Sequence, residues 1–254
     1  MKKGVIYTAV TGGYDDFKHH FNDEQFDYVC FTDYNYTGLV PSPWFHVRLP
    51  PSKLNNKDLA RYCKLNPHLL LPNYAFSVWI DGNIIIKRDI HSYVQNILAN
   101  HQVASYEHWW RDQTEQEFYV CATQGFDYVW KLKRQFLRYK NDGYRSDNFY
   151  ENNVIFRRHN NLQVVNMHNF WWGEYIKGGR RDQYSFTYSA FKTNVRIFSL
   201  GVHDPRILKK YFDYVEHVKR RPKLQYIKIL INRTYLMIFG WNVPPSKKKN
   251  LLLK

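Results

Sequence analysis

The most informative segment of the chain reads Phe76-Ser77-Val78-Trp79-Ile80-Asp81-Gly82-Asn83-Ile84-Ile85-Ile86. The apolar runs on both sides predict buried β structure, and Asp-Gly-Asn predicts a short turn between them. Asp81 and Asn83 are then expected at the edge of a hydrophobic sheet, where a desolvated carboxylate needs a partner. Two oxygen donors with one small residue between them can hold a hard divalent cation, which can in turn hold a diphosphate. The alternative is an ordinary Asp-Gly hairpin turn.

Strands and helices are predicted to alternate around this segment. Strands are expected at residues 5–10, 26–33, 45–49, 102–106, 153–157 and 196–200, and helices at 56–65, 90–98, 127–139 and 182–191. This alternation predicts an α/β fold with ligands outside the carboxyl ends of the strands.

Basic residues are concentrated at the C-terminal end of the 254-residue chain. Residues 206–254 carry 13 Lys/Arg against Asp213 and Glu216, whereas residues 1–205 carry 24 Lys/Arg and 20 Asp/Glu. We therefore expect a catalytic domain at 1–204 and a basic helical tail at 205–254, with the boundary close to Asp204-Pro205.

The N-terminus and the cysteines suggest a cytoplasmic protein. Met1-Lys2-Lys3-Gly4 leads directly into a predicted strand, so no secretory signal is expected, and no run of 18 uncharged apolar residues predicts a membrane span. Cys30, Cys63 and Cys121 show no metal-ligand spacing and are expected to be buried, reduced thiols.

The basic tail predicts two amphipathic helices separated by Pro222. Lys228 and Arg233 interrupt the second, so we expect it to lie in the interface of an anionic membrane rather than to span it. The alternative is a pair of helices packed on the body with a solvated basic face. A basic tail also suits nucleic acid, but no RNA-binding motif is present and no nucleic-acid partner is expected. Apolar residues recur at helical spacing in both segments: Ile207, Leu208, Tyr211, Phe212 and Val215, then Leu224, Ile227, Leu230 or Ile231, Tyr235 and Ile238.

Polar residues follow the first two predicted strands. In Thr11-Gly12-Gly13 the glycines allow a ligand to approach the backbone, although a plain turn is the commoner reason for such a pair. The neighbouring Tyr14 can stack on a nucleobase or be a surface aromatic. Asp33 can accept from a base or a ribose, or cap a helix. Arg61 and Lys64 share one helix face and can neutralise a diphosphate, or form a solvated basic face.

Three further groups are candidates for the reacting centre. Glu151 and Asn153 begin a predicted strand and can hydrogen-bond sugar hydroxyls or cap the strand. Asp182 lies at a predicted helix start, where the helix dipole favours its ionised form; this suits a general base or an ordinary N-cap. His203 follows the last strand of the body and can complete a metal site with Asp81 and Asn83, or be structural.

Five short motifs, in this order, resemble a known family. That family is a glycosyltransferase-like group long catalogued as a domain of unknown function, with plant mucilage- and cell-wall-related proteins and bacterial surface-polysaccharide enzymes among its members. The resemblance covers residues 4–204 and implies a GT-A fold that binds a nucleotide-sugar and Mn²⁺ or Mg²⁺. The motifs are Thr8-Ala9-Val10-Thr11-Gly12-Gly13-Tyr14-Asp15, Phe31-Thr32-Asp33, Lys64-Leu65-Asn66-Pro67-His68, Trp79-Ile80-Asp81-Gly82-Asn83 and Arg181-Asp182-Gln183-Tyr184-Ser185-Phe186.

The resemblance also implies roles for individual residues. Asn83 stands where an Asp-x-Asp motif has its second acid; its amide is a weaker ligand, so His203 is more necessary or metal affinity is lower. Retaining and inverting stereochemistry both stay open. The implied positions are Val10, Thr11 and Tyr14 around the nucleotide, Asp33 on its base or ribose, Lys64 near the diphosphate, Asp81 and Asn83 in the metal turn, and Asp182 and Gln183 beside the reacting sugar carbon, with Glu151 as reserve base.

Two functions from different classes follow. The first is a metal-dependent glycosyltransferase that moves a sugar from a nucleotide-sugar, UDP-linked, to a surface-glycan or lipid-linked acceptor at the inner membrane face. The second is a non-catalytic carbohydrate-binding or scaffold module with a nucleic-acid-binding tail. Hydrolysis of the nucleotide-sugar distinguishes them, because a binding module shows none.

Overall fold

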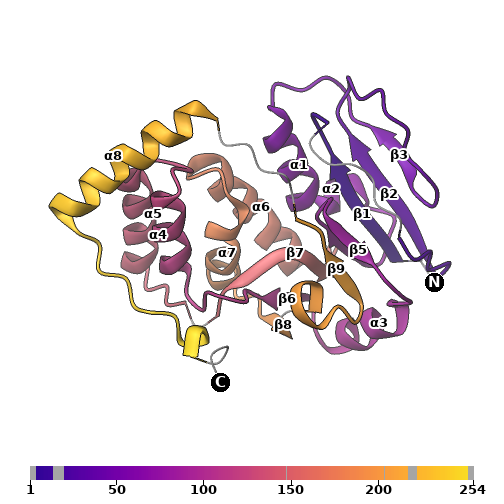
Figure 1. The fold of residues 1–254 in the computed structure, drawn as a ribbon. Helices are drawn as coiled ribbons and strands as arrows, with labels where there is room; N and C mark the ends of the chain where they lie inside the picture. Colours follow the sequence, from indigo (N-terminus) through magenta and orange to yellow (C-terminus); the bar gives the residue numbers. More distant parts are fainter. Residues whose placement is uncertain (1–3, 14–19, 147, 203, 217–221, 251–254) are drawn as a thin grey trace.

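The computed structural model describes residues 4–13, 20–146, 148–202, 204–216 and 222–250. Its centre is a seven-stranded sheet in the order β3-β2-β1-β4-β7-β6-β8 (Figure 1). All neighbours are parallel except β7, which is antiparallel to both β4 and β6. The predicted α/β class is confirmed. The strands are β1 (Gly4–Val10), β2 (Phe26–Thr32), β3 (Phe45–Arg48), β4 (Ser77–Ile80), β6 (Val103–Glu107), β7 (Tyr150–Arg157) and β8 (Ile197–Val202).

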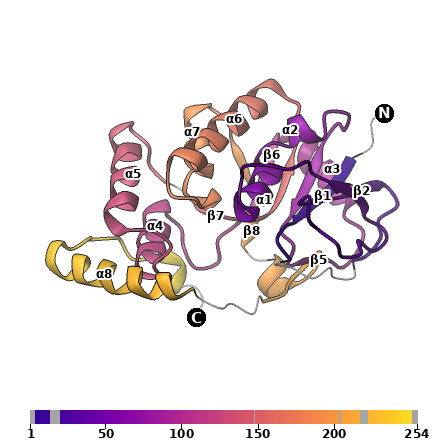
Figure 2. The same ribbon diagram turned by 90° about the horizontal axis from the view of Figure 1, so that it is seen from above.

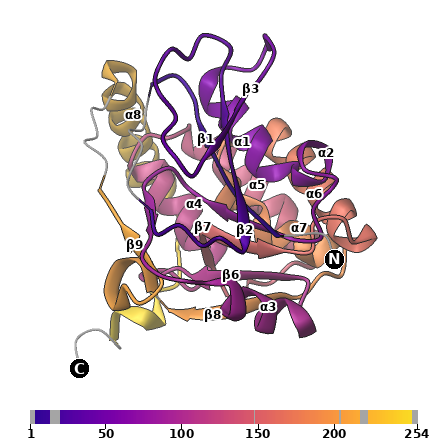
Figure 3. The same cartoon turned by 90° about the vertical axis from the view of Figure 1, so that its right-hand side faces the viewer.

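Helices cover both faces of the sheet, which explains why its central strands are apolar on both sides. One core cluster joins Tyr7 of β1 to residues of α1, α6 and α7, and a second joins Ile6 of β1 to residues of α3. In Figure 3, α3 lies on the side of the sheet away from α1 and α6. A separate cluster joins α4 and α5. The helices are α1 (Asn56–Leu65), α2 (Pro67–Leu70), α3 (His91–Asn100), α4 (Thr114–Thr123), α5 (Val129–Asn141), α6 (Leu162–Lys177), α7 (Phe186–Lys192) and α8 (Lys223–Phe239).

The Asp-Gly-Asn turn connects two sheets. Ile84 N donates to Asp81 O at 2.9 Å, which closes the turn. The strand after it, β5 (Ile84–Ile86), pairs with β9 (Phe212–Tyr214) in a small second sheet, whereas β4 stays in the large sheet. The hairpin alternative is therefore wrong, since β4 and β5 do not pair.

The prediction of the first of two amphipathic C-terminal helices is wrong. A π-helical turn at Asp204–Leu208 is followed by β9, and Phe212 is fully buried in the core. The Asp204 carboxylate accepts the backbone N–H groups of Lys210, Tyr211 and Phe212 at 2.7–2.8 Å, which fixes the chain in this shape. The packed body thus continues past the compositional shift at Asp204-Pro205.

The second predicted helix is present as α8, which lies along α4 and α5 (Figure 2). None of the helices in the described part of the chain has the length and apolar character needed to cross a membrane.

Candidate active site

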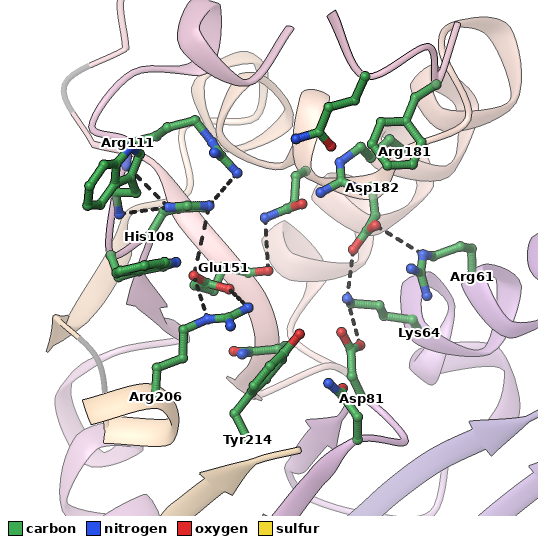
Figure 4. A pocket seen from close by; sticks show the side chains of 17 residues that line it. Arg61, Lys64, Asp81, His108, Arg111, Glu151, Arg181, Asp182, Arg206 and Tyr214 are labelled. Carbon is green, nitrogen blue, oxygen red and sulfur yellow. Dashed lines mark hydrogen bonds and ion pairs between the residues drawn. The ribbon is translucent and has the colours of Figure 1, made fainter. Parts of the chain in front are cut away.

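A cavity of about 400 Å³ opens beyond the carboxyl end of β4 (Figure 4). It brings together side chains from α1, the Asp-Gly-Asn turn, β7 and the 3₁₀ turn Asp182–Tyr184. Eight residues predicted from the sequence line it: Arg61, Lys64, Asp81, Asn83, Glu151, Asn153, Asp182 and Gln183.

On one wall, Lys64 bridges two carboxylates. Its side chain is only 1% exposed, and Nζ lies 2.6 Å from Asp182 Oδ2 and 3.0 Å from Asp81 Oδ1. Arg61, one turn earlier on α1, places Nε 3.0 Å from Asp182 Oδ1. Trp79 Nε1 donates to Asp81 Oδ1 at 2.7 Å. This wall is a network of short, charge-assisted contacts.

The same cations fix the protonation state of Asp182. Burial alone raises the pKa of its carboxyl, but Arg61, Lys64 and Arg181 outweigh that effect and hold the pKa well below its usual range. Asp182 is therefore a permanent anion near neutral pH and a weak proton acceptor. Its chemistry is suited to orienting Arg61 and Lys64.

The opposite wall carries a carboxylate in a different environment. The side chain of Glu151 on β7 is 8% exposed, and its oxygens lie 3.3 and 3.4 Å from Arg206 nitrogens and 3.8 Å from His108 Nε2. Burial raises the pKa of Glu151, and Arg206 offsets this only in part. A carboxyl group with a raised pKa is suited to general acid–base catalysis.

Two amide side chains lie between these walls. Gln183 Nε2 donates to the carbonyls of Tyr150 and Glu151 at 3.3 and 3.1 Å, so the 3₁₀ turn is tied to β7. Asn153 Oδ1 is buried and has no hydrogen-bond partner among the described residues. Because Asn153 lines the cavity, this unsatisfied buried acceptor is a candidate for a hydrogen bond from a ligand or a water molecule.

The metal turn offers two oxygen donors. Asn83 Nδ2 donates to Val215 O at 2.9 Å, which leaves the amide oxygen for a ligand. No group of three His, Cys, Asp or Glu suited to a metal occurs within the described ranges, and His203 lies outside them. Asp81 and Asn83 therefore fit a cation whose remaining ligands are phosphate oxygens, a common arrangement for Mg²⁺.

The residues predicted around the nucleotide lie near a second cavity of about 690 Å³. Asp33 and Gly12 line it, and Asp33 Oδ2 accepts from Gly12 N at 2.7 Å. Gly12 has φ +68°, and an added Cβ would meet the Asn56 side chain at 2.4 Å, so the position requires glycine. Val10 and Thr11 are buried and line neither cavity, and Tyr14 lies outside the described residues.

Several lining residues were not predicted as site residues from the sequence. Arg181 is the first residue of the family motif that contains Asp182, so the sequence did indicate that it lies near the site. Arg206 lies in the π-helical turn Asp204–Leu208, just before the residues wrongly expected to form an amphipathic helix, and no local pattern indicates its place. The unpredicted residues of greatest interest are His108, Arg111, Arg181, Arg206 and Tyr214.

The fold and site thus define an α/β domain whose pocket lies at the end of the central strands. Arginine and lysine outnumber acidic residues in the lining of that pocket. Residues 45–217 match the TOD1/MUCI70, glycosyltransferase-like domain, and the chain belongs to this family. The expected glycosyltransferase-like family is thereby confirmed. No curated protein matches the chain in sequence.

Among solved structures, the chain is similar to the bifunctional glycosyltransferase WbbM, with 12% identity and a TM-score of 0.47 over 92% of this chain. It is similar to the galactosyltransferase LgtC, with 10% identity and a TM-score of 0.43 over 76% of this chain and 72% of LgtC. It is also similar to GlyE of Streptococcus pneumoniae, with 10% identity and a TM-score of 0.45 over 97% of this chain and 65% of GlyE. The chain spans 44% of the WbbM chain.

Proposed function

We propose that this glycosyltransferase takes its sugar from a nucleotide-sugar, UDP-linked, and transfers it to a glycan or lipid-linked acceptor. The observation that carries the proposal is the charge of the pocket. Three carboxylates are outnumbered there by five cationic side chains, namely Arg61, Lys64, Arg111, Arg181 and Arg206. Such a surplus suits a diphosphate, which arginine forks and lysine ammonium groups bind well.

The position of the two cavities supports a donor that spans them. β1 and β4 are parallel neighbours, so the glycine turn after β1 and the Asp81 turn after β4 lie at the same edge of the sheet. The nucleoside would occupy the cavity at Gly12 and Asp33. The diphosphate would lie against Arg61 and Lys64, with Asp81 and Asn83 holding Mn²⁺ or Mg²⁺ and His203 as a possible third ligand.

The second wall suits the acceptor. In this proposal Glu151 takes the proton of the acceptor hydroxyl, and the oxygen of that hydroxyl bonds to the anomeric carbon of the donor sugar. The bond from that carbon to the diphosphate oxygen breaks, and the nucleoside diphosphate leaves with the electron pair. Asn153 Oδ1 and Gln183 are placed to contact the transferred sugar, and Asp182 orients the two cations that meet the leaving group. The divalent cation, when bound, neutralises charge on the diphosphate.

A thermal-shift screen of UDP-, GDP- and dTDP-sugars, with and without Mn²⁺, tests the proposal. We expect one nucleotide class to raise Tm and Mn²⁺ to increase the shift, because a ligand that binds only the folded state stabilises it. The same donor should be slowly hydrolysed. Lys64→Met is the matched variant and should lose most of the shift. Stabilisation by free glycans alone, with no nucleotide effect and no hydrolysis, would support the non-catalytic alternative instead.

A further inference from the structure

Helix α8 is fixed to the body by a fully buried polar side chain in its middle. Asn232 is fully buried, and its side chain donates to Ala122 O and Asp127 O at 2.7 and 2.8 Å and accepts from Val129 N at 2.9 Å. Gly125 provides close contact, since a Cβ there would lie 2.5 Å from Gln225 O. The helix therefore presents a defined side to α4 and α5 (Figures 1 and 2).

The side facing away from the body is apolar. At 100° per residue, the positions opposite Asn232 include Ile227, Leu230 and Ile238, which are 55%, 68% and 68% exposed. Of the expected alternative, the packing of this helix on the body is present, but its outward side is mainly apolar rather than basic. A contiguous exposed apolar face usually marks an interaction site. The exposed apolar residues of the helix are Leu224, Tyr226, Ile227, Leu230, Ile231, Met237, Ile238 and Phe239.

The charges around this face have one sign. Residues 222–250 contain no Asp or Glu, and the exposed Lys223 and Arg233 and the half-buried Lys228 lie on α8 itself. Lys247 is exposed nearby, whereas Lys248 is engaged with Glu107 at 2.8 Å. Within residues 222–250 the charged side chains that accompany this apolar face are therefore all basic, which complements an anionic lipid surface.

We propose that α8 docks the protein on an anionic bilayer, with its exposed apolar face among the acyl chains and its basic residues at the headgroups. Tyr235 and Trp241 are not available for headgroup contact, because both pack toward α5 and Trp241 Nε1 donates to Glu115 at 3.0 Å. Tyr226, which is 58% exposed and lies on the outward side, is better placed for that role.

Docking on this face brings the active-site pocket to the membrane. Gln225 Nε2, at the start of α8, donates to Gln124 O at 2.8 Å, and both Gln124 and Phe126 line the pocket. Phe126 is 44% exposed. The rim that these residues form thus lies beside the docking helix, which favours an acceptor carried by a lipid. The inference of a lipid-carried acceptor rests on the proposed function, whereas the docking of α8 on the bilayer does not.

Vesicle sedimentation of the full chain tests the docking. We expect binding to vesicles of phosphatidylglycerol and phosphatidylcholine, little binding to phosphatidylcholine alone, and loss at high salt. The double variant Ile227→Glu, Leu230→Glu should weaken binding at least tenfold. Leu162→Glu is the matched control, because Leu162 is 74% exposed on α6, away from α8. Donor-induced thermal shifts should be unchanged in all variants, which separates this test from that of the proposed function.

Three other outcomes would overturn the proposal. Equal sedimentation of the double variant and the Leu162→Glu control would show that the apolar face is not the docking surface. A lipid-independent dimer that only the double variant dissociates, seen by light scattering, would assign the face to a second copy of the chain. Binding to single-stranded RNA in place of vesicles would likewise assign the tail to nucleic acid.

Discussion

The two walls of the pocket each hold a buried carboxylate, yet they prepare it for different chemistry. Asp182 contacts Lys64 and Arg61 at 2.6 and 3.0 Å, and its pKa is lowered. Glu151 meets Arg206 only at 3.3 and 3.4 Å, and burial raises its pKa. Burial is common to both groups, so the distance and number of the cations decide the difference. One wall is suited to binding charge and the other to moving a proton.

The largest expected effect comes from breaking the charge-binding wall at the turn. Asp81→Ala should reduce transfer to background, because it removes the carboxylate that Lys64 and a divalent cation share, a loss of several kcal/mol of transition-state stabilisation. Donor turnover measured with Mn²⁺ and with EDTA checks this. Asn83→Asp is the control and should keep or raise metal affinity. Wild-type turnover by Asp81→Ala in EDTA would contradict the metal-dependent mechanism.

Next in size is the loss of the proton acceptor. Glu151→Gln should lower kcat by about 10²–10⁴-fold while donor affinity changes little, since a general base contributes in that range. Asp182→Asn is the matched variant on the other wall and should weaken donor binding as well as kcat. Calorimetric titration of the donor beside steady-state rates separates the two effects. The reverse pattern would exchange the roles of the two carboxylates.

A smaller effect, tenfold per pH unit at most, is expected in the pH profile. A base must be ionised, so kcat should rise with pH through the pKa of Glu151, which lies above the ordinary Glu value of 4.5. Asp182 should not add to the pH dependence of kcat in this range, because its pKa is lowered and it stays ionised. Arg206→Met should move the limb to higher pH, because Arg206 is the cation that lowers the pKa of Glu151. A limb that persists unshifted in Glu151→Gln would assign it to another group.

The comparison of the two walls also shows what the sequence could predict. The charge-binding wall comes from Arg61 and Lys64 on one face of a predicted helix, Asp81 directly after a strand and Asp182 at a predicted helix start, where periodicity and turn chemistry are informative. The second wall depends on Arg206 and His108, which reach the pocket only through long-range packing. No local pattern distinguishes them from surface residues.

The errors in secondary structure have the same cause. Residues 207–215 have apolar residues at helical spacing, yet Asp204 caps the backbone and Phe212 is buried as part of β9. Tertiary pairing with β5 thus overrode the local pattern. In α8 the pattern was right, but which side faces solvent depended on Asn232, whose burial no single-helix pattern reveals.

The smallest effect on rate is expected behind the second wall, at Glu117. This fully buried carboxylate lies 2.5 Å from Arg111 Nε and 2.6 Å from Arg181 Nε, so it holds two of the pocket's cations in place. Glu117→Gln should lower the free energy of unfolding by about 3 kcal/mol, since it leaves buried charge unpaired, and should change kcat only a fewfold. Burial raises the pKa of Glu117, but Arg181 and Arg111 outweigh it, so the pKa is lowered. The stabilisation is therefore present above the ordinary Glu pKa and lost as the pH falls below it, and the gap between variant and wild type should narrow in acid. Urea unfolding at two pH values measures this. Lys131→Met, which removes an exposed ion pair with Asp127, is the control and should cost under about 1 kcal/mol. If both variants cost the same, Glu117 does not support the pocket through its charge.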